Sequence, residues 1–516
     1  MAQAHPDVLP HSEALTADWS TASVPDTDAA ELEGILSSAA GAAGPLRDTD
    51  SAARAGALRS VADALDGAAD ELVAIAMVET SLAEQRLVGE VARTTGQLRM
   101  FADGLDEGSW MDIIIDTARP ASTPPRPDLR RFQRALGPVL VFTASNFPFA
   151  FSVAGGDVAS ALAAGCPVVV KVHPGHPQTS DRSAAVVIEA LATAGMPDGC
   201  LALIHGQEAG VTALRDPRIA AASFTGSEVG GRALFDIATS RDVPIPFFAE
   251  MGSLNPVFVS SGAVAARGDS IASDYVASFL LGLGQFCTKP GLLFLPRDHG
   301  LTDRLVDAVR GVAPGRLLMD RIHDGHRTGR DALASRPGVR TLVQGDLDGR
   351  TAGGTLLLTD VATLCSDPAD LLTECFGPTS ILVEYDDLNE ALAAARLFPG
   401  CLTATVHAEA GEDFGTQLLD ELSDRAGRLV WNGWPTGVAV SWAMHHGGPY
   451  PATTTPEHTS VGMTAIRRFL RPVCYQDCPQ ELLPDVLRDA NTSGIPRRID
   501  GRLSTDDITR ADPVPT

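Results

Sequence analysis

One cysteine stands in a segment whose composition would leave its sulfur accessible. Cys287 lies in GQFCTKPG, residues 284–291, directly after a predicted apolar helix over 270–283. The small and turn-forming residues around it free the backbone amides near the sulfur. A substrate can approach a thiol in such a place, and the N–H of Cys287 can bind an oxyanion that forms beside it. Taken alone, the segment fits a buried structural cysteine more often than a nucleophile, so other motifs must decide.

Lysine is almost absent from the chain. Lys171 and Lys289 are the only two among 40 basic residues, and arginine supplies the rest. An ammonium and a planar guanidinium differ in reach, donor geometry and hydration. A lysine that persists under such a bias therefore indicates a site that does not tolerate arginine. Chance survival at two surface positions is the alternative.

Strands and helices alternate in the segment that contains Lys171. An apolar run over 139–143, a helix over 153–164 and the β-branched run 168–170 form a strand–helix–strand unit that ends at Lys171. The alternation continues with a helix over 182–194, a strand over 201–204, a helix near 208–214 and a strand over 222–225. This pattern predicts a parallel doubly wound sheet that binds a nucleotide at the carboxyl ends of its strands.

The remaining segments are assigned from the periodicity of apolar residues and from turn-forming residues. Residues 1–50 are predicted to be a weakly structured lead-in with a short helix over 29–39, and residues 50–104 to form two amphipathic helices. The proline-rich stretch 120–127 predicts a turn into an edge element. A second α/β block is predicted over 254–440, with a strand near 380–384.

Composition limits the possible partners. The 516 residues are 44% hydrophobic and 20% charged, as in a soluble globular protein of two or three domains. A formal charge of -25 would repel nucleic acid and anionic membranes, so neither is expected as a partner. We find no signal peptide and no membrane-length apolar run, and expect a cytoplasmic protein. The 8 cysteines lack CxxC spacing, which predicts neither a metal site nor a disulfide framework.

Five short motifs resemble those of the aldehyde dehydrogenase superfamily, in the same order along the chain. GQFCTKPG resembles the family's nucleophile loop, GQxCT. The others are TASNFP at 143–148, FTGS at 224–227, EMGS at 250–253, which resembles ELGG, and ECFGP at 374–378, which resembles ExFGP. Each motif alone is weak, but chance agreement of all of them in order is negligible.

The resemblance implies a catalytic role for three residues. Cys287 would add as a thiolate to the aldehyde carbon, and the oxyanion would receive hydrogen bonds from the Asn146 amide and the Cys287 N–H. Hydride would pass to NAD(P), leaving a thioester. Glu250 would then activate the water that hydrolyses it.

The resemblance also implies a set of cofactor-binding residues. Lys171 would bind the adenosine ribose and Glu374 the nicotinamide ribose, while Ser227 at a helix start would contact the pyrophosphate. The full expected set is Lys171, Thr143, Ser227, Gly226, Gly230, Glu374 and Phe376. The chain has no complete GxGxxG after a strand, as the superfamily leads one to expect.

The implied fold is two doubly wound, Rossmann-like α/β domains, one for the cofactor and one catalytic, plus a small β oligomerisation element. The expected boundaries are 1–118 for N-terminal helices and part of the cofactor domain, 119–136 for an oligomerisation strand, 137–252 for the cofactor domain, 253–440 for the catalytic domain and 441–516 for a C-terminal segment. The stretches 128–136 and 467–475 match the family's oligomerisation strands, and as edge strands they would seek a partner. We expect a dimer or a dimer of dimers.

Departures from the general family pattern bear on the substrate. Ser253 replaces a glycine of ELGG, and HHGGPYP at 445–451 replaces the familiar PFGG segment. With SNFPFAFSVAGGD at 145–157 and NPVFV at 255–259, the chain is most similar to the α-ketoglutaric semialdehyde (2,5-dioxovalerate) dehydrogenase branch. The resemblance implies oxidation of 2,5-dioxopentanoate to 2-oxoglutarate, with fatty or other aliphatic aldehydes as the alternative. The expected substrate contacts are Phe147, Phe149, Pro435, Thr436, His445 and His446, the histidines being candidate donors to a substrate carboxylate.

Selectivity between NAD and NADP is predicted from the segment after Lys171. Enzymes that select NAD commonly place a carboxylate near the adenosine ribose, where it repels a 2′-phosphate. Residues 172–180 contain no acid, and the first one is Asp181. We therefore expect NADP to be accepted and slightly favoured over NAD.

Three other functions remain open. A CoA-acylating relative would not need Glu250, because a thiol acceptor requires no carboxylate aimed at water. A catalytically silent binding or structural relative would have been free to lose Cys287, Glu250, Asn146 and Glu374. A cysteine hydrolase would need a histidine near Cys287, which the sequence does not exclude.

Overall fold

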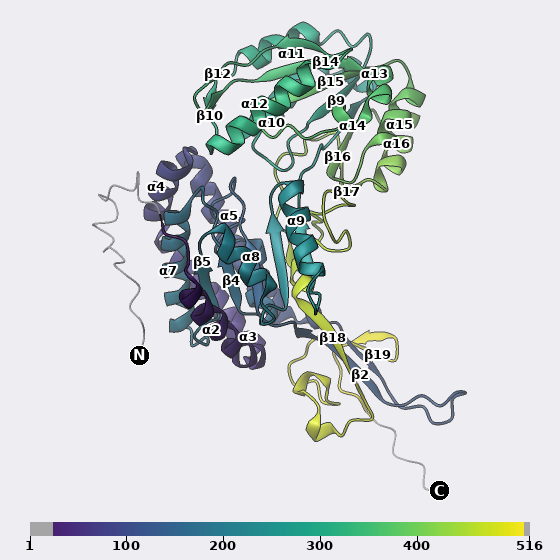
Figure 1. The fold of residues 1–516 in the computed structure, drawn as a ribbon. Coiled ribbons are helices and arrows are strands. Elements are labelled where there is room, and N and C mark those ends of the chain that lie inside the picture. Colours follow the sequence, from purple (N-terminus) through teal and green to yellow (C-terminus); the bar gives the residue numbers. More distant parts are fainter. Residues whose placement is uncertain (1–23, 510–516) are drawn as a thin grey trace.

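The computed structural model describes residues 24–509, and a parallel sheet forms the first of its two α/β bodies (Figure 1). The sheet order is β5-β4-β3-β6-β7, with all neighbours parallel. Its strands are β3 (Val139–Phe142), β4 (Val168–Lys171), β5 (Leu201–Ile204), β6 (Ala221–Thr225) and β7 (Phe247–Glu250).

This sheet is buried on both faces because successive side chains of a strand point to opposite sides. Val168 and Val170 pack into one hydrophobic cluster, whereas Val169 packs into another. The connecting helices are α6 (Gly156–Ala164), α7 (Pro177–Thr193), α8 (Gln207–Arg215) and α9 (Glu228–Thr239). The predicted doubly wound α/β arrangement is confirmed.

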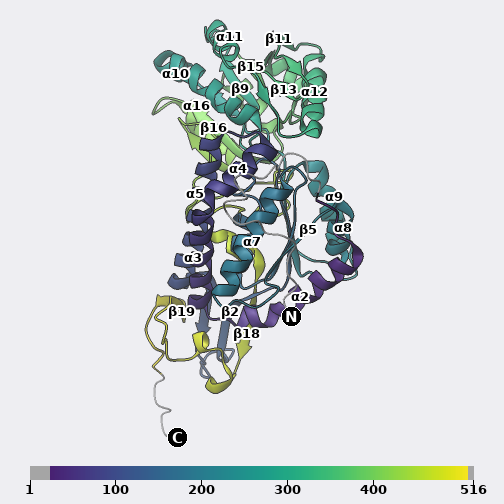
Figure 2. The ribbon, with the colours of Figure 1, turned by 90° about the vertical axis from the view of Figure 1, so that its left-hand side faces the viewer.

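The N-terminal helices cover this body, and their number differs from the prediction. The stretch predicted as two helices contains three, α3 (Ser51–Gly67), α4 (Ala69–Thr80) and α5 (Glu84–Glu107), which lie along one side with α7 (Figure 2). Apolar periodicity does not reveal the breaks, because one non-helical residue, Ala68, separates α3 from α4 and a left-handed Ser81 ends α4. The first helix, α2 (Ala29–Asp48), is also longer than the predicted 29–39 and continues through Pro45.

A seven-stranded sheet forms the second body, in the order β11-β14-β15-β9-β8-β16-β17. Only β11 pairs antiparallel with its neighbour. The strands are β8 (Val257–Val259), β9 (Leu292–Pro296), β11 (Arg340–Val343), β14 (Thr355–Asp360), β15 (Thr379–Tyr385), β16 (Cys401–His407) and β17 (Ala426–Trp431). A small sheet of β10 (Gly315–Arg316), β12 (Leu347–Asp348) and β13 (Thr351–Ala352) lies beside it.

Helices cover both faces of this second sheet. They are α10 (Ser261–Leu280), α11 (Thr302–Arg310), α12 (Asp320–Ala334), α13 (Val361–Ser366), α14 (Pro368–Leu371), α15 (Leu388–Leu397) and α16 (Asp413–Ser423). The predicted helix over 270–283 was misplaced at both ends: α10 begins at Ser261 and kinks at Arg267. It ends at Leu280 because Gly282, Leu283 and Gly284 adopt positive φ, which a helix cannot continue.

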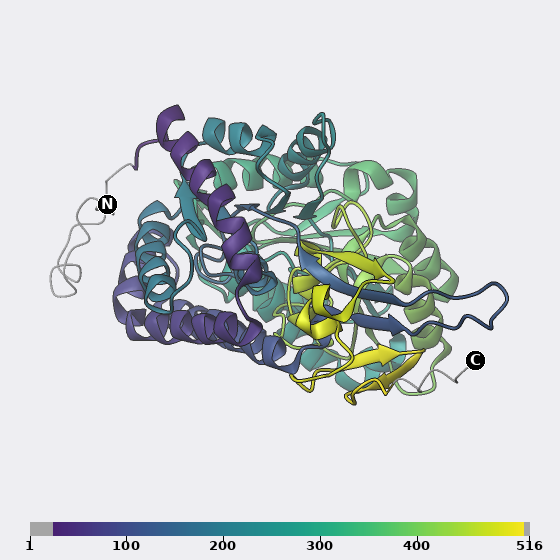
Figure 3. The ribbon, with the colours of Figure 1, turned by 90° about the horizontal axis from the view of Figure 1, so that it is seen from below.

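A third sheet projects from the first body as an arm, with the order β18-β2-β1-β19-β20 (Figure 3). Its strands are β1 (Ile113–Asp116), β2 (Leu129–Ala135), β18 (Leu470–Gln476), β19 (Arg497–Ile499) and β20 (Arg502–Ser504). The prediction that both 128–136 and 467–475 are edge strands was half wrong, since β18 lies at the edge but β2 is paired on both sides. Within residues 24–509 no helix is long and apolar enough to span a bilayer.

Candidate active site

The loop that carries Cys287 follows α10 and a short 3₁₀ helix, η2 (Leu281–Gly284). A side chain at Gly284 would overlap the Gly377 carbonyl, so the turn into the loop requires glycine. The side-chain amide of Asn255 donates to the Cys287 carbonyl at 2.8 Å and to the Lys289 carbonyl at 2.9 Å. Asn255 therefore fixes the backbone on both sides of Thr288, while the Cys287 thiol stays partly exposed.

Ser253, the departure from ELGG, supports the same backbone. Its hydroxyl donates to the side-chain oxygen Oδ1 of Asn255 at 2.7 Å and accepts the Leu402 N–H at 2.9 Å. Both hydrogen-bonding capacities of this buried hydroxyl are therefore used inside the protein.

Three side chains from distant segments meet at the sulfur. His446 Nε2 lies 3.5 Å from Cys287 Sγ and 3.0 Å from a Glu250 carboxylate oxygen. Glu250 ends β7, while His446 lies on the loop after β17, where its N–H donates to the Thr459 hydroxyl at 2.8 Å. The Ser460 hydroxyl donates to the other Glu250 oxygen. The donor atoms of Glu250, Cys287 and His446 all lie within 4.8 Å of one another, so this trio could also bind a metal ion, which would block the thiol.

The protonation preferences of this trio follow from burial and mutual charge. Burial and then the Glu250 carboxylate raise the pKa of the Cys287 thiol well above its ordinary value. Burial alone would raise the pKa of Glu250, but His446, Ser460 and Cys287 together hold it below its ordinary value. A protonated thiol thus contacts an ionised carboxylate directly, with the imidazole of His446 beside both, and deprotonating the thiol requires a base. His446 is in contact with it.

Asn146 reaches the nucleophile loop from the other body. Its side-chain Nδ2 donates to the Gln285 carbonyl at 3.0 Å, two residues before Cys287. Its backbone carbonyl accepts from Arg86 of α5 at 2.5 Å. Phe147 packs edge-on against Phe286, with ring centroids 5.3 Å apart, and this pair forms one apolar wall beside the loop. The structure therefore brings Asn146 and Phe147 together with Cys287.

Two arginines that the sequence reasoning missed face the same site. Arg93 of α5 stacks on Phe151, with 5.4 Å between the guanidinium carbon and the ring centroid, and has no hydrogen bond or ion pair within residues 24–509. Burial lowers the pKa of Arg93, and the acidic groups Glu90, Cys287 and Glu250 oppose that shift. Burial also lowers the pKa of Arg428 on β17, again opposed by Cys287. Helical spacing could have placed Arg86 and Arg93 on one face of a helix, but not opposite Cys287.

The residues expected at the adenosine side gather at the carboxyl edge of the first sheet. Thr143 follows β3, and its N–H and hydroxyl both lie 3.3 Å from the Lys171 carbonyl at the end of β4. Ser227 caps α9, its hydroxyl accepting the Gly230 N–H at 3.3 Å, and Gly226 precedes it. The first residues of α9 are exposed, which suits an anion.

The neighbouring helix α7 is closed to an anion by a side chain of the protein. Glu79 of α4 accepts the N–H groups of Gln178 at 2.9 Å and Thr179 at 2.8 Å in its first turn. Because this carboxylate already occupies the start of α7, the start of α9 is the better place for a pyrophosphate. The residues present therefore fit a dinucleotide.

Glu374 and Phe376 lie on the loop between α14 and β15. A side chain at Gly252 would overlap the Glu374 carboxylate, which places Glu374 against the segment that follows Glu250. Burial raises the pKa of Glu374 to about 7, although Lys289 and the Ser253 N–H act to lower it. Glu374 thus lies between the two bodies, on the catalytic side of the cofactor residues.

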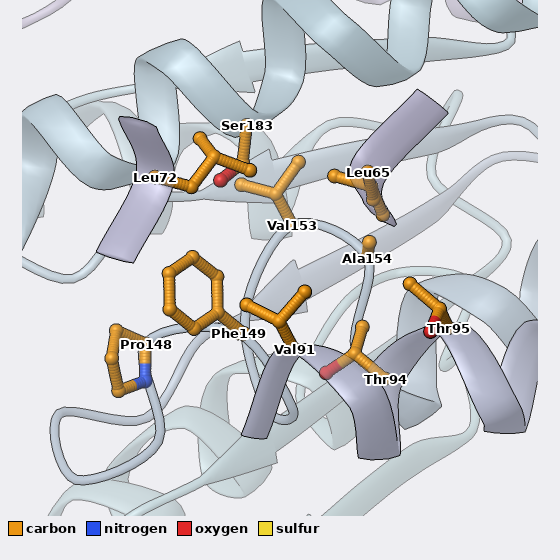
Figure 4. Close-up of a pocket in the computed structure, with 10 residues that line it drawn as sticks. All are labelled: Leu65, Leu72, Val91, Thr94, Thr95, Pro148, Phe149, Val153, Ala154 and Ser183. Carbon is orange, nitrogen blue, oxygen red and sulfur yellow. The ribbon is translucent and has the colours of Figure 1, made fainter. Parts of the chain in front are cut away.

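The remaining predicted substrate residues lie farther from the sulfur. Thr436 hydrogen-bonds to Ser278 of α10, and the Pro435 carbonyl accepts from Arg428, so both belong to a loop held behind that arginine. His445 packs beside Gly447. Phe149 lies in the hydrophobic core of the first body, with its N–H bonded to Glu90 at 2.9 Å. Figure 4 shows it lining a small internal cavity with Leu65, Leu72, Val91, Thr94, Thr95, Pro148, Val153, Ala154 and Ser183. The structure does not bring Phe149 to the site.

A cysteine with a histidine and a carboxylate, beside a dinucleotide-binding edge, defines a thiol-dependent oxidoreductase. The chain belongs to the aldehyde dehydrogenase family, whose model matches residues 15–450. It is an NAD(P)-dependent enzyme that acts on aldehyde groups, and the resemblance stated from five motifs is confirmed.

Named relatives cover most of the chain. It is 47% identical over 461 residues to alpha-ketoglutaric semialdehyde dehydrogenase 2 of Azospirillum brasilense, covering 87% of each chain. It is 44% identical over 458 residues to alpha-ketoglutaric semialdehyde dehydrogenase of Acinetobacter baylyi, again covering 87% of each. The crystal structure of an NAD-dependent aldehyde dehydrogenase from Sinorhizobium meliloti matches with a TM-score of 0.75 at 22% identity, covering 88% of each chain. That likeness confirms the fold class.

The position of Phe149 makes a prediction about stability. Phe149→Ala should lower the free energy of unfolding by about 3–5 kcal/mol, because it removes a fully packed ring from the core. The KM for aldehyde should change less than about twofold, within the scatter expected of a residue that touches no substrate. Denaturant unfolding and steady-state kinetics measure both. An unchanged stability with a much higher KM would return Phe149 to the substrate pocket.

Proposed function

We propose that this enzyme oxidises α-ketoglutaric semialdehyde, or a semialdehyde that likewise carries a carboxylate, to the dicarboxylic acid. The main support for this substrate class is the position of Arg93. Its guanidinium faces the nucleophile, is largely buried and has no ion pair in the described chain. Arg428 adds a second cation. A guanidinium binds a carboxylate with two parallel hydrogen bonds, and a fatty aldehyde would leave it without a partner. The names of the two bacterial relatives support the same substrate.

The chain's own groups can carry out each proton transfer. His446, with its own proton on Nδ1, takes the Cys287 proton at Nε2, the nitrogen that contacts both Sγ and Glu250, and the thiolate adds to the aldehyde carbon. The oxyanion accepts hydrogen bonds from the Cys287 N–H and from Asn146, whose amide uses one of its two N–H groups on the Gln285 carbonyl and has the other to offer. The cofactor residues would hold NAD(P) so that it supplies the acceptor for the hydride of this carbon, and Cys287 would then carry the thioester. Water then attacks the thioester, its proton passes to Glu250 directly or through His446, and the carboxylate leaves as the thiol is restored.

The cofactor residues are proposed from their place at the sheet edge. Lys171 and Thr143 would bind the adenosine ribose, Ser227 with Gly226 and Gly230 the pyrophosphate, and Glu374 with Phe376 the nicotinamide end. We further propose residues 137–252 as the cofactor domain and 253–440 as the catalytic domain. Support for this division comes from the cofactor residues at the ends of the first sheet's strands and from the nucleophile after α10 of the second body.

Acceptance of NADP rests on the charges around Lys171. Burial lowers the pKa of Lys171, and Arg321 lowers it further, so two cations lie near the expected 2′-phosphate. The N-terminal segment adds an opposing charge, because Asp26 lies against Gly206 at the end of β5 and also acts on Lys171. We propose that NADP is accepted and slightly favoured, and that Asp26 limits the preference.

Assembly is proposed to use the arm. The edge strand β18 leaves one side without a partner strand, and Leu503 of β20 is 68% exposed. Such an edge favours pairing with a second copy, giving a dimer or a dimer of dimers. Sedimentation that shows only a 53.9 kDa species at micromolar concentration would contradict this.

The division of work between thiol and carboxylate predicts two different kinetic traces. Cys287→Ala should produce no NAD(P)H at all. Glu250→Gln should give a burst near one equivalent per site and then a steady state about 10²- to 10⁴-fold slower, because hydrolysis loses its base. Stopped-flow absorbance at 340 nm separates the phases. Turnover at the wild-type rate would place the base elsewhere, and loss of the burst would mean that Glu250 is needed before acylation.

The substrate proposal predicts a selective loss. Arg93→Met should lower kcat/KM for the semialdehyde about 10- to 100-fold, the worth of a charge-assisted hydrogen bond, and should leave hexanal unaffected. Arg99→Met is the matched control, because Arg99 is an arginine of the same helix that forms surface ion pairs with Asp63 and Asp66. Equal efficiency of the wild type on hexanal and on the semialdehyde would remove the proposal.

The cofactor proposal predicts that Asp26→Asn raises the ratio of kcat/KM for NADP to that for NAD. The change removes a negative charge beside the expected phosphate and keeps the size of the side chain. Steady-state kinetics with both cofactors gives the ratio. A wild-type preference for NAD above tenfold would count against the assignment, and an unchanged ratio in the variant would exclude Asp26 from selectivity.

A further inference from the structure

Lys289, the second lysine of the chain, is buried under the nucleophile loop with only 2% of its surface exposed. Its ammonium donates to three backbone carbonyls: Cys375 at 2.5 Å, Thr379 at 3.0 Å and Gly377 at 3.3 Å. An ammonium has three N–H groups, so each of them has an acceptor. These contacts account for a buried charge that would otherwise be costly.

The three acceptors explain why arginine does not replace this lysine. They belong to one loop, residues 375–379, and surround a single point. A compact ammonium can direct its protons to three converging carbonyls, whereas the planar fork of a guanidinium is wider and holds its donors in one plane. Lys289 therefore occupies a site that does not tolerate arginine, as predicted from its presence in a chain where arginine supplies nearly all basic residues.

The loop held by Lys289 begins beside Glu374. Lys289, Glu374 and Ser253 line one small internal cavity of about 10 Å³, which is room for about one water molecule. The ammonium and the carboxylate thus share one enclosed space. Lys289 is also only two residues from Cys287, so one side chain connects the backbone of the nucleophile to the backbone that carries Glu374.

We propose that Lys289 is a positioning residue, which ties the nucleophile loop to the loop carrying Glu374 and so keeps that carboxylate aimed at the nicotinamide ribose. The proposal rests on the cofactor role given to Glu374 above. It predicts that Lys289 acts through Glu374, on the placement of the nicotinamide relative to Cys287. A lysine that only stabilised the fold would not affect that placement.

The charges around Glu374 determine the sign of the effect. Burial raises its pKa to about 7 and Glu228 raises it further, while Lys289 and the Ser253 N–H lower it. The thiols of Cys287, Cys375 and Cys401 also face this charge, and His326 and Arg330 lie on the far side of Lys289. Loss of the ammonium therefore raises the pKa of Glu374. The ionised carboxylate is the better acceptor for ribose hydroxyls. Without the ammonium, tight binding of the dinucleotide should therefore require a higher pH.

The test uses Lys289→Met, Glu374→Gln and the double variant, each checked by thermal unfolding. NADH affinity is measured between pH 6 and 9 by fluorescence without aldehyde, and the burst rate of NADH formation is measured with aldehyde and NAD. The wild type should show an affinity midpoint near the pKa of Glu374, about 7. In Lys289→Met the midpoint should move up by about one unit, a typical effect of removing one nearby charge. Its burst should slow about 10- to 100-fold, as expected when a reacting group is misplaced.

The double variant shows whether the lysine acts through the carboxylate. It should match Glu374→Gln alone in affinity and in burst rate, because the two residues form one unit. Lys171→Met serves as the comparison, since loss of the lysine at the adenosine end should weaken NADH at every pH without moving the midpoint. Lys289→Gln, which keeps two donors for the carbonyls, is the second variant if Lys289→Met unfolds.

Several results would overturn the proposal. An unmoved midpoint in Lys289→Met, additive effects in the double variant, or unfolding of both Lys289 variants would each reduce the lysine to a structural role. Failure of the proposed function is distinguishable, because the wild type itself would then bind no NADH or form none from the aldehyde. If the wild-type midpoint persisted in Glu374→Gln, another group would be responsible for it.

Discussion

The contact that joins Cys287, His446 and Glu250 requires two α/β bodies to be held edge to edge. Glu250 ends a strand of the first sheet, Cys287 follows a helix of the second, and His446 comes from a loop still later in the chain. None of these groups could perform its step alone: the thiol is protonated without a base, and a buried carboxylate is costly without a partner. Asn146 of the first body bonds to the Gln285 carbonyl of the second, and Lys289 fixes the nucleophile loop to the Glu374 loop within the second body.

Charged groups at the surface and charged groups at the site are arranged differently. The chain carries a formal charge of -25, and many of its arginines form ion pairs with acids at the surface. Two cations without an ion pair in residues 24–509 lie where anions are expected, Arg93 beside the sulfur and Lys171 at the strand ends. Against a negative surface, a local unpaired guanidinium is the simplest way to select a substrate that is itself negative.

Much of the fold and part of the site could be predicted from the sequence. Alternating apolar runs gave the parallel sheet, since Val168, Val169 and Val170 must be buried on both faces, and ordered motifs located Cys287, Glu250 and Glu374. Helix ends were missed at Ser81 and Leu283, where single residues of positive φ end an otherwise periodic stretch. Arg93 and the contact of His446 with the thiol were missed because no spacing along the chain reports which helix face opposes which loop. Phe149 was misassigned because it is two residues from Phe147, and the turn there directs the two rings to opposite sides.

Glu79 also determines which helix start is available to bind a phosphate. Two helices of the first body, α7 and α9, begin at the same edge of the sheet, and both would present free amides to an anion. By accepting the first amides of α7, Glu79 leaves the start of α9, which follows a strand two positions away in the sheet, as the open helix start for a phosphate. The choice of phosphate site therefore depends both on the open start of α9 and on the start of α7 being filled by a carboxylate. Because Glu79 belongs to the same chain, its carboxylate competes with any phosphate for the first amides of α7.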